Sequence, residues 1–311
     1  MSLNEDNSFE LNGYEPDKIT LTLVAFDQYG NESLPHKILI TREKEDNENE
    51  IVFDRLNPNN LKARQDNNKV ALLIGVESYQ NMSDALFASR DAKFFIDYLT
   101  NGIGINTSNI KLILNEEASF LGTKLSLKKW AKLNIKENSE VYVYYSGHGL
   151  AMNKGEDLYL LANDTSPDFI QDSAIRRNDI FNEIAKYGPK SVTVFLDTCY
   201  SGAGRADGEM LLAMAKGLVV VDEQQQKLPD NFTLFTAASA QESAWSLPEA
   251  QHGTFSYFLM KGMEGNADLN GDKKLTNGEL RDYLLDNVGR YAQQQQTPQM
   301  VGDPNQVLIK F

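Results

Sequence analysis

The sequence is poor in cysteine and in long apolar runs. Its 311 residues include one cysteine. Because a disulfide needs two cysteines, no intramolecular disulfide can form, and cysteine usage leaves the redox compartment open. No apolar run approaches the roughly 18 residues that a membrane-spanning helix needs, so we expect no membrane span.

Positive charge is also scarce. The chain has 30 Lys and Arg against 44 Asp and Glu, which gives a formal net charge of -14. It therefore lacks the basic footprint of nucleic-acid-binding proteins, and its electrostatics favour basic partners. No apolar core of a signal peptide stands at the N-terminus, so we expect the sequence as given to be soluble. Its localisation stays open, because an export signal could have been removed upstream.

The cysteine and one of the histidines follow two similar apolar runs. Cys199 stands shortly after the run 191–196, and His148 shortly after the run 141–145. In open α/β sheets, active sites lie beyond the carboxyl ends of strands, and an imidazole beside a thiol can accept its proton. We interpret Cys199 as a nucleophile and His148 as its base. Glycines flank both residues, which permits tight turns and close approach of a substrate chain.

Each of these residues alone also fits a structural role. A single cysteine after a strand is often an inert, buried side chain, and a histidine in a glycine-rich turn is often structural. The pair is more informative, because a histidine about 50 residues before a cysteine is typical of caspase-type peptidases. His252 is the rival imidazole in the second half of the sequence, and we expect a structural or rim role for it.

Two segments resemble the signature motifs of a known family. They are Tyr145-Ser-Gly-His-Gly149 and Asp197-Thr-Cys-Tyr-Ser-Gly202. Both resemble motifs of the caspase-like cysteine peptidases, closest to the metacaspases and their bacterial relatives, and the similarity runs from about Lys69 to Phe311. The resemblance implies a cysteine endopeptidase that needs no cofactor for its chemistry. It also implies that the backbone N–H groups of Gly149 and Cys199 stabilise the oxyanion.

Strand and helix patterns alternate from Lys69 onward. Such alternation predicts an α/β fold with a largely parallel sheet and helices on both faces, and the resemblance implies a caspase–hemoglobinase fold of about six strands. Expected strands cover 70–76, 110–114, 141–145, 158–161, 192–196 and 232–236, and expected helices cover 83–100, 119–133, 179–187, 255–264 and 277–291.

The residues before Lys69 form a separate region. Residues 1–45 contain two alternating apolar segments around a glycine-containing turn, which predicts a β-hairpin resembling the end of an immunoglobulin-like sandwich. Two strands are not stable alone, so the hairpin either packs on the main domain or ends a longer domain. Residues 46–68 are rich in Asn, Asp and Glu and predict a linker, and residues 69–311 form the peptidase domain.

Acidic residues near the motifs indicate the substrate class. Asp197 lies two residues before Cys199, so both side chains point to the same side of an extended strand. By resemblance to metacaspases, Asp91, Ser146 and Asp197 form a pocket for an arginine or lysine of a protein or peptide substrate. The alternatives are a solvated helix acid at Asp91 and a turn aspartate at Asp197. A peptidase of the same fold that cleaves after Asn or Asp is a further alternative.

The segment that follows the cysteine motif contains further basic residues. Relatives often carry a processing loop here, so we expect self-cleavage within 203–231 at one of three candidates, Arg205, Lys216 and Lys227. An enzyme without processing is the alternative.

An acidic segment near the C-terminus matches the ligand spacing of a calcium loop. Its ligand positions are Asp268, Asn270, Asp272, Lys274 and Glu279. Lys273 replaces the glycine that usually occupies the sixth position, so a polar loop that caps the following helix is the alternative interpretation.

A function of another class stays open, namely a non-catalytic signalling or scaffold module that kept the caspase fold. The presence of both His148 and Cys199 argues against it. The sequence does not determine the natural substrate, the pathway, the zymogen status or the oligomeric state.

Overall fold

The chain divides into two units, Met1–Phe53 and Asp54–Phe311. The computed structural model describes residues 18–24, 33, 36–41, 53–152, 157–198, 228–239, 242, 244–293 and 295–311. In the smaller unit, β1 (Lys18–Leu23) pairs antiparallel with β2 (His36–Thr41). These strands lie in the segments expected to form a hairpin. The turn at 27–31 lies outside the described residues, and the immunoglobulin-like resemblance stays a prediction.

Six strands of the larger unit form one mostly parallel sheet. Their order across the sheet is β14-β10-β9-β5-β3-β4. All neighbouring pairs are parallel except β10 and β14. The strands are β3 (Lys69–Gly75), β4 (Ile110–Leu114), β5 (Glu140–Ser146), β9 (Ser191–Asp197), β10 (Phe232–Thr236) and β14 (Gln299–Val301). This arrangement confirms the predicted α/β class and the six-stranded sheet.

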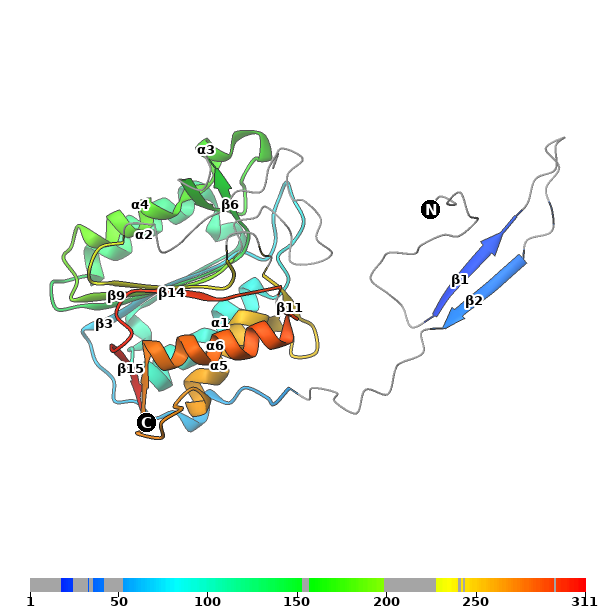
Figure 1. Cartoon of the computed structure of the whole chain (residues 1–311). Helices are drawn as coiled ribbons and strands as arrows, with labels where there is room; N and C mark the ends of the chain where they lie inside the picture. Colours follow the sequence, from blue (N-terminus) through cyan, green and yellow to red (C-terminus); the bar gives the residue numbers. More distant parts are fainter. Residues whose placement is uncertain are drawn as a thin grey trace. The chain divides into compact units, whose positions relative to one another are not determined.

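Helices cover both faces of the sheet, as Figure 1 shows. One face carries α1 (Ala88–Tyr98), α5 (Thr254–Lys261) and α6 (Asn277–Tyr291), and the other carries α2 (Phe120–Asn134), α3 (Ile170–Ser173) and α4 (Arg177–Ala185). The first helix starts later than the expected Ser83. The Glu77 carboxylate accepts the backbone N–H of Ser89 at 3.2 Å near this helix start, and residues 83–87 form an irregular segment before it.

The central strands are buried because helices cover them on both sides. Every residue of β10 is buried, and so is every residue but the first of β3, β5 and β9. Near-continuous apolar runs of this kind are typical of parallel strands. Phe195 on β9 stacks on Phe235 with ring centroids 5.3 Å apart, and Phe95 from α1 packs edge-on against Phe195 at 5.6 Å. This packing fixes the strand ends that carry the motifs.

Shorter elements surround the main sheet. The expected strand at 158–161 is β7 (Asp157–Leu160), which belongs to a separate sheet with β6 (Gly149–Met152) and β8 (Ile175–Arg176). β11 (Ser246–Leu247) pairs with β12 (His252–Gly253), and β13 (Lys274–Thr276) pairs with β15 (Val307–Lys310). Single helical turns occur at Pro58–Asn60, Leu99–Ile103, Thr107–Asn109, Asn115–Ala118, Pro167–Phe169 and Gly262–Asn266.

The second half of the expected linker packs on the larger unit. Leu61 is buried, and the N–H groups of Ala63 and Asp66 donate to the carbonyls of Asn101 and Gly104 at 2.7 and 2.8 Å. Residues 54–68 are therefore part of the larger unit's surface.

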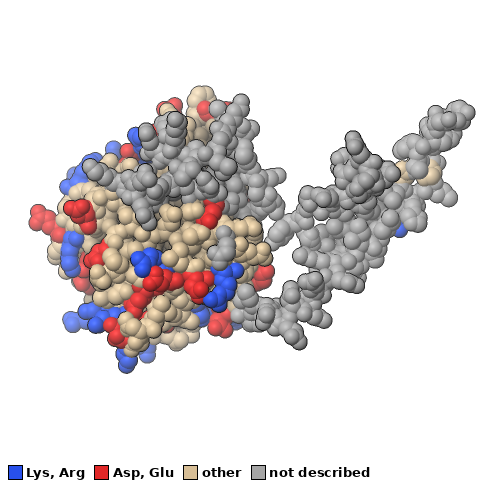
Figure 2. Space-filling view, viewed as in Figure 1, with Lys and Arg blue, Asp and Glu red and all other residues tan. Residues whose placement is uncertain are grey.

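Charges of both signs are interspersed over the described surface that Figure 2 shows, without one large basic area. This surface agrees with the net charge of -14. Among the described residues, no helix combines the length and the apolar character that crossing a bilayer requires.

Candidate active site

His148 is held by its backbone and by its ring at the end of β5. Its N–H donates to the Tyr79 hydroxyl at 2.7 Å, and its carbonyl accepts the Tyr145 hydroxyl at 2.7 Å. The Tyr79 ring lies 4.8 Å from the imidazole, centroid to centroid. The imidazole Nε2 lies 3.0 Å from the carbonyl oxygen of Ser83. These contacts hold the backbone and the ring of His148 in place.

The Ser83 contact determines which ring nitrogen carries the hydrogen. A carbonyl oxygen can only accept a hydrogen bond, so Nε2 of His148 is the donor. In the neutral imidazole, the lone pair is then on Nδ1. His148 is thus arranged as a proton acceptor through Nδ1, and the Ser83 carbonyl has the orienting part that a carboxylate plays in other His-containing sites.

The ends of β5 and β9 lie side by side. Ser146 and Asp197 are paired in the sheet register, and the N–H of Gly147 donates to the Asp197 carbonyl at 3.3 Å. His148 and Cys199 each follow a member of this pair by two residues. Thr198 is buried, whereas Cys199 lies outside the described residues. Gly149 starts β6, where it pairs with Leu160, and its role as an oxyanion donor stays a prediction.

Asp91 and His252 form a buried pair near these strand ends. Asp91 on α1 has no exposed surface, and His252 on β12 is 4% exposed. The imidazole Nδ1 lies 2.5 Å from Asp91 Oδ1, and the Gly253 N–H donates to Asp91 Oδ2 at 2.8 Å. Both carboxylate oxygens are therefore bound by consecutive residues of one short strand.

The environment of Asp91 opposes its charge. Burial raises the pKa of Asp91 from 3.8 to about 6, and the nearby carboxylate of Asp197 adds to this rise. The hydrogen bond and the electrostatic interaction with His252, together with the Gly253 N–H, act in the opposite direction. The Asp91 charge thus depends on a balance between desolvation and these donors.

Asp197 is the second fully buried carboxylate. Its Oδ2 accepts the Ser256 hydroxyl at 2.5 Å, and the oxygens of Ser256 and Tyr144 are 2.6 Å apart. Ser146, its neighbour in the sheet, is also fully buried. The structure thus brings the expected acids Asp91 and Asp197 within electrostatic range of one another, with Ser146 next to Asp197.

A comparison with protein-family models identifies the family of this chain. The model described as caspase domain matches residues 68–308. The chain belongs to the caspase domain family. Caspase domains are cysteine peptidases, so membership supports a peptidase-like function in general and implies substrates that are proteins or peptides. The sequence matches no curated protein.

Two solved structures have a similar fold. Protein GSU0716 from Geobacter sulfurreducens has 16% sequence identity and a TM-score of 0.52, over 78% of this chain and 97% of that chain. Caspase-1 from Spodoptera frugiperda has 14% identity and a TM-score of 0.51, over 83% of this chain and 95% of that chain. At such identities, the likeness concerns the fold alone.

Gly147 of the caspase domain has no room for a side chain. Its φ is +153°, and an added Cβ would lie 2.7 Å from the Tyr79 hydroxyl and 2.8 Å from the Tyr145 hydroxyl. Both hydroxyls hold the backbone of His148. Alanine at this position would therefore displace the hydroxyls, the histidine or both.

We predict that Gly147→Ala lowers kcat/KM on any peptide substrate by about 100-fold, the usual effect of an ångström-scale displacement of a reacting group. Gly188→Ala is the matched control, because Gly188 also has a positive φ but its added Cβ would lie 3.9 Å from the nearest atom, on Glu137. The control is expected to lose about 1 kcal/mol of stability, the cost of a side chain in the left-handed region, and no activity. Equal activity in the two variants would contradict the prediction.

The expected calcium loop has its oxygens engaged in hydrogen bonds within the loop. The Asp268 carboxylate accepts the N–H groups of Gly271, Asp272 and Lys273 at 2.9 to 3.2 Å, and Asn270 Nδ2 donates to Glu279 Oε1 at 2.7 Å. Lys273 has a φ of +63°. Glu279 also forms a capping box with Thr276 at the start of α6, which is the capping role of the alternative interpretation.

No group of three or more His, Cys, Asp or Glu side chains is placed to hold a metal ion within the described ranges. Calcium binding at this loop therefore stays a prediction of the sequence. The self-cleavage candidates Arg205, Lys216 and Lys227 lie outside the described residues.

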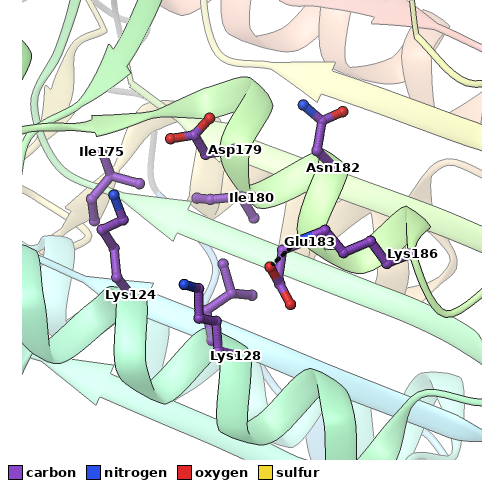
Figure 3. A pocket seen from close by; sticks show the side chains of 9 residues that line it. Lys124, Lys128, Ile175, Asp179, Ile180, Asn182, Glu183 and Lys186 are labelled. Carbon is purple, nitrogen blue, oxygen red and sulfur yellow. Dashed lines mark hydrogen bonds and ion pairs between the residues drawn. The ribbon is translucent and has the colours of Figure 1, made fainter.

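A hollow of about 230 Å³ lies between α2 and α4, on the face of the sheet opposite to the one that carries α1. Figure 3 shows Lys124 and Lys128 of α2 on one side of it and Asp179 and Glu183 of α4 on the other. Lys186 Nζ donates to Glu183 Oε2 at 2.7 Å at its edge. The side chains that line the hollow carry charges of both signs, so the hollow indicates no particular ligand.

Sequence reasoning missed three contributors to the site. They are the Ser83 carbonyl that orients His148, the His252 ring that binds Asp91, and the Ser256 hydroxyl that binds Asp197. His252 is buried against Asp91 rather than placed at a rim. The segment 252–256, which contains Gly253 and leads into α5, was the only local signal for the last two.

Proposed function

We propose that this caspase domain is a cysteine endopeptidase that cleaves after arginine or lysine, with Cys199 as nucleophile and His148 as base. The observation that carries the specificity is the proximity of two fully buried carboxylates, Asp91 and Asp197. Buried like charges are costly unless a cation is added. An arginine or lysine side chain would supply that cation, whereas an aspartate would add a third negative charge.

In the proposed mechanism, Nδ1 of His148 accepts the proton of the Cys199 thiol. The thiolate attacks the scissile carbonyl carbon, and the backbone N–H groups of Gly149 and Cys199 are the expected donors to the oxyanion. The C–N bond breaks as the imidazolium returns the proton to the leaving amine. Water then gives a proton to His148 and attacks the thioester, which releases the carboxylic product and restores the thiol.

Fluorogenic peptides that differ only in the residue before the cleaved bond test this proposal. The series ends in Arg, Lys, Asn or Asp and is assayed with calcium or with chelator, on the wild type and on Cys199→Ala. We expect hydrolysis of the Arg and Lys peptides, and none in the variant. Cleavage of the Asn or Asp peptide alone would disprove the assigned pocket, and silence on all four would favour the scaffold alternative or a latent zymogen.

We also propose self-cleavage within 203–231, since Arg205, Lys216 and Lys227 match the proposed specificity. The predicted result is that intact mass spectrometry finds two fragments of the wild type and one full-length mass of Cys199→Ala. Replacing the three basic residues by glutamine should leave a full-length protein. Lys190→Gln, outside the segment, is the matched control and should still be cut. An active wild type with only the full-length mass would refute processing.

A further inference from the structure

We propose that His252 is a specificity-determining positioning residue, which keeps Asp91 ionised and oriented so that the pocket selects basic side chains. The inference rests on the proposed function of the pocket in binding arginine or lysine. His252 acts through Asp91 and is not assigned contact with substrate.

Both residues of β12 bind the carboxylate of Asp91. His252 Nδ1 lies 2.5 Å from Oδ1, and the Gly253 N–H donates to Oδ2 at 2.8 Å. An ionised carboxylate offers only acceptors, so two donors in this arrangement favour its charged form and fix its plane. The two partners reach Asp91 from a segment 161 residues away in the chain.

The imidazole itself is held by aromatic neighbours. Phe94 packs edge-on at 5.3 Å between ring centroids, and Tyr257 lies 6.4 Å away. With 4% of its surface exposed, His252 cannot swing out to solvent without disturbing this packing. The donor is thus preorganised, which is what a group that positions a charge requires.

Removing the His252 donor would disturb the balance at Asp91. Among the influences that favour the ionised form, the hydrogen bond from His252 is the largest. Burial and Asp197 would then raise the pKa of Asp91 further, and the pocket would lose one of its two charges near neutral pH.

Other charged groups near Asp91 do not replace His252. Arg90 on the same helix donates to Gln251 Oε1 at 2.7 Å, and Lys93 is exposed. On β3, β4, β5 and α5, which pack against α1, the remaining titratable side chains are Lys69, Lys111, Glu140, Tyr142, Tyr144, Tyr145, Tyr257 and Lys261. β9, whose Phe195 contacts Phe95 of α1, adds Asp197.

The test compares His252→Leu, which lacks a donor, with His252→Asn, whose side-chain amide can donate from nearly the position of Nδ1. His252→Ala is a second donor-free variant in case the leucine disturbs folding. For each protein, kcat/KM on an arginine peptide is measured from pH 5.5 to 9. The rate of Cys199 alkylation by iodoacetamide is measured over the same range, because this small neutral reagent reports the dyad without using the pocket.

We expect the donor-free variants to lose about 10-fold or more in kcat/KM at pH 6.5 and to recover toward pH 9. Alkylation should stay unchanged, and His252→Asn should remain within a few-fold of the wild type. A loss that is equal at every pH, or no loss, would overturn the role of His252. If the wild type cleaves only other peptides, the proposed basic specificity fails first and the inference falls with it.

Discussion

Replacing His148 by alanine is expected to lower kcat on every peptide substrate by about 1000-fold, within the range that general base catalysis contributes. The reason is that Nδ1 of His148 is the expected acceptor of the Cys199 proton, oriented through the Nε2 contact with Ser83 at 3.0 Å. Without the imidazole, the Cys199 thiol should titrate like a free cysteine, with a pKa of about 8.5. Stopped-flow kinetics and the pH dependence of iodoacetamide alkylation measure the two effects.

Two control variants separate this effect from a loss of structure. His36→Ala changes a histidine outside the caspase domain and should leave activity unchanged. Tyr79→Phe removes the acceptor of the His148 N–H at 2.7 Å but keeps the ring, so we expect a loss of about 10-fold only, consistent with one hydrogen bond. If His148→Ala keeps more than a tenth of the wild-type activity, His148 is not the base.

Local sequence patterns predicted the elements that position the site. The apolar runs that became β5 and β9 are buried on both faces, so their composition left little choice of structure, and β4, β10 and α6 have the expected bounds. The strand-end positions of the motifs followed from these runs. Motif resemblance supplied the grouping of Asp91 with Asp197, which no local pattern contains.

The features that the sequence patterns did not predict depend on contacts between distant segments. Asp91 and His252 are 161 residues apart and meet because β12 packs against α1. The late start of α1 has a similar origin, since the residues before it include Ser83, whose carbonyl contacts His148. Neither contact changes hydrophobic periodicity, which is the signal that sequence patterns carry.

Asp197→Asn is expected to lower kcat/KM on arginine peptides by about 30-fold or more, because losing one partner of a buried charge pair typically costs about 2 to 5 kcal/mol. The fold should survive, since asparagine can still accept the Ser256 hydroxyl that now donates to Asp197 at 2.5 Å. Asp179→Asn on α4 is the matched control, because it removes the same charge from an exposed position on the other face of the sheet.

The same variant should change the pH dependence of stability through Asp91. Burial and Asp197 raise the pKa of Asp91 from 3.8 to about 6, so the folded state binds more protons than the unfolded state between these values. The free energy of unfolding therefore falls as the pH rises through this window, by up to about 3 kcal/mol above pH 6.

Removing the Asp197 charge lowers the pKa of Asp91, so this fall becomes smaller in Asp197→Asn. Urea unfolding at pH 5 and pH 7.5 measures the difference, and Asp179→Asn should match the wild type. If the three proteins show the same pH dependence, the two carboxylates do not interact, and the argument for a shared cationic ligand loses its basis.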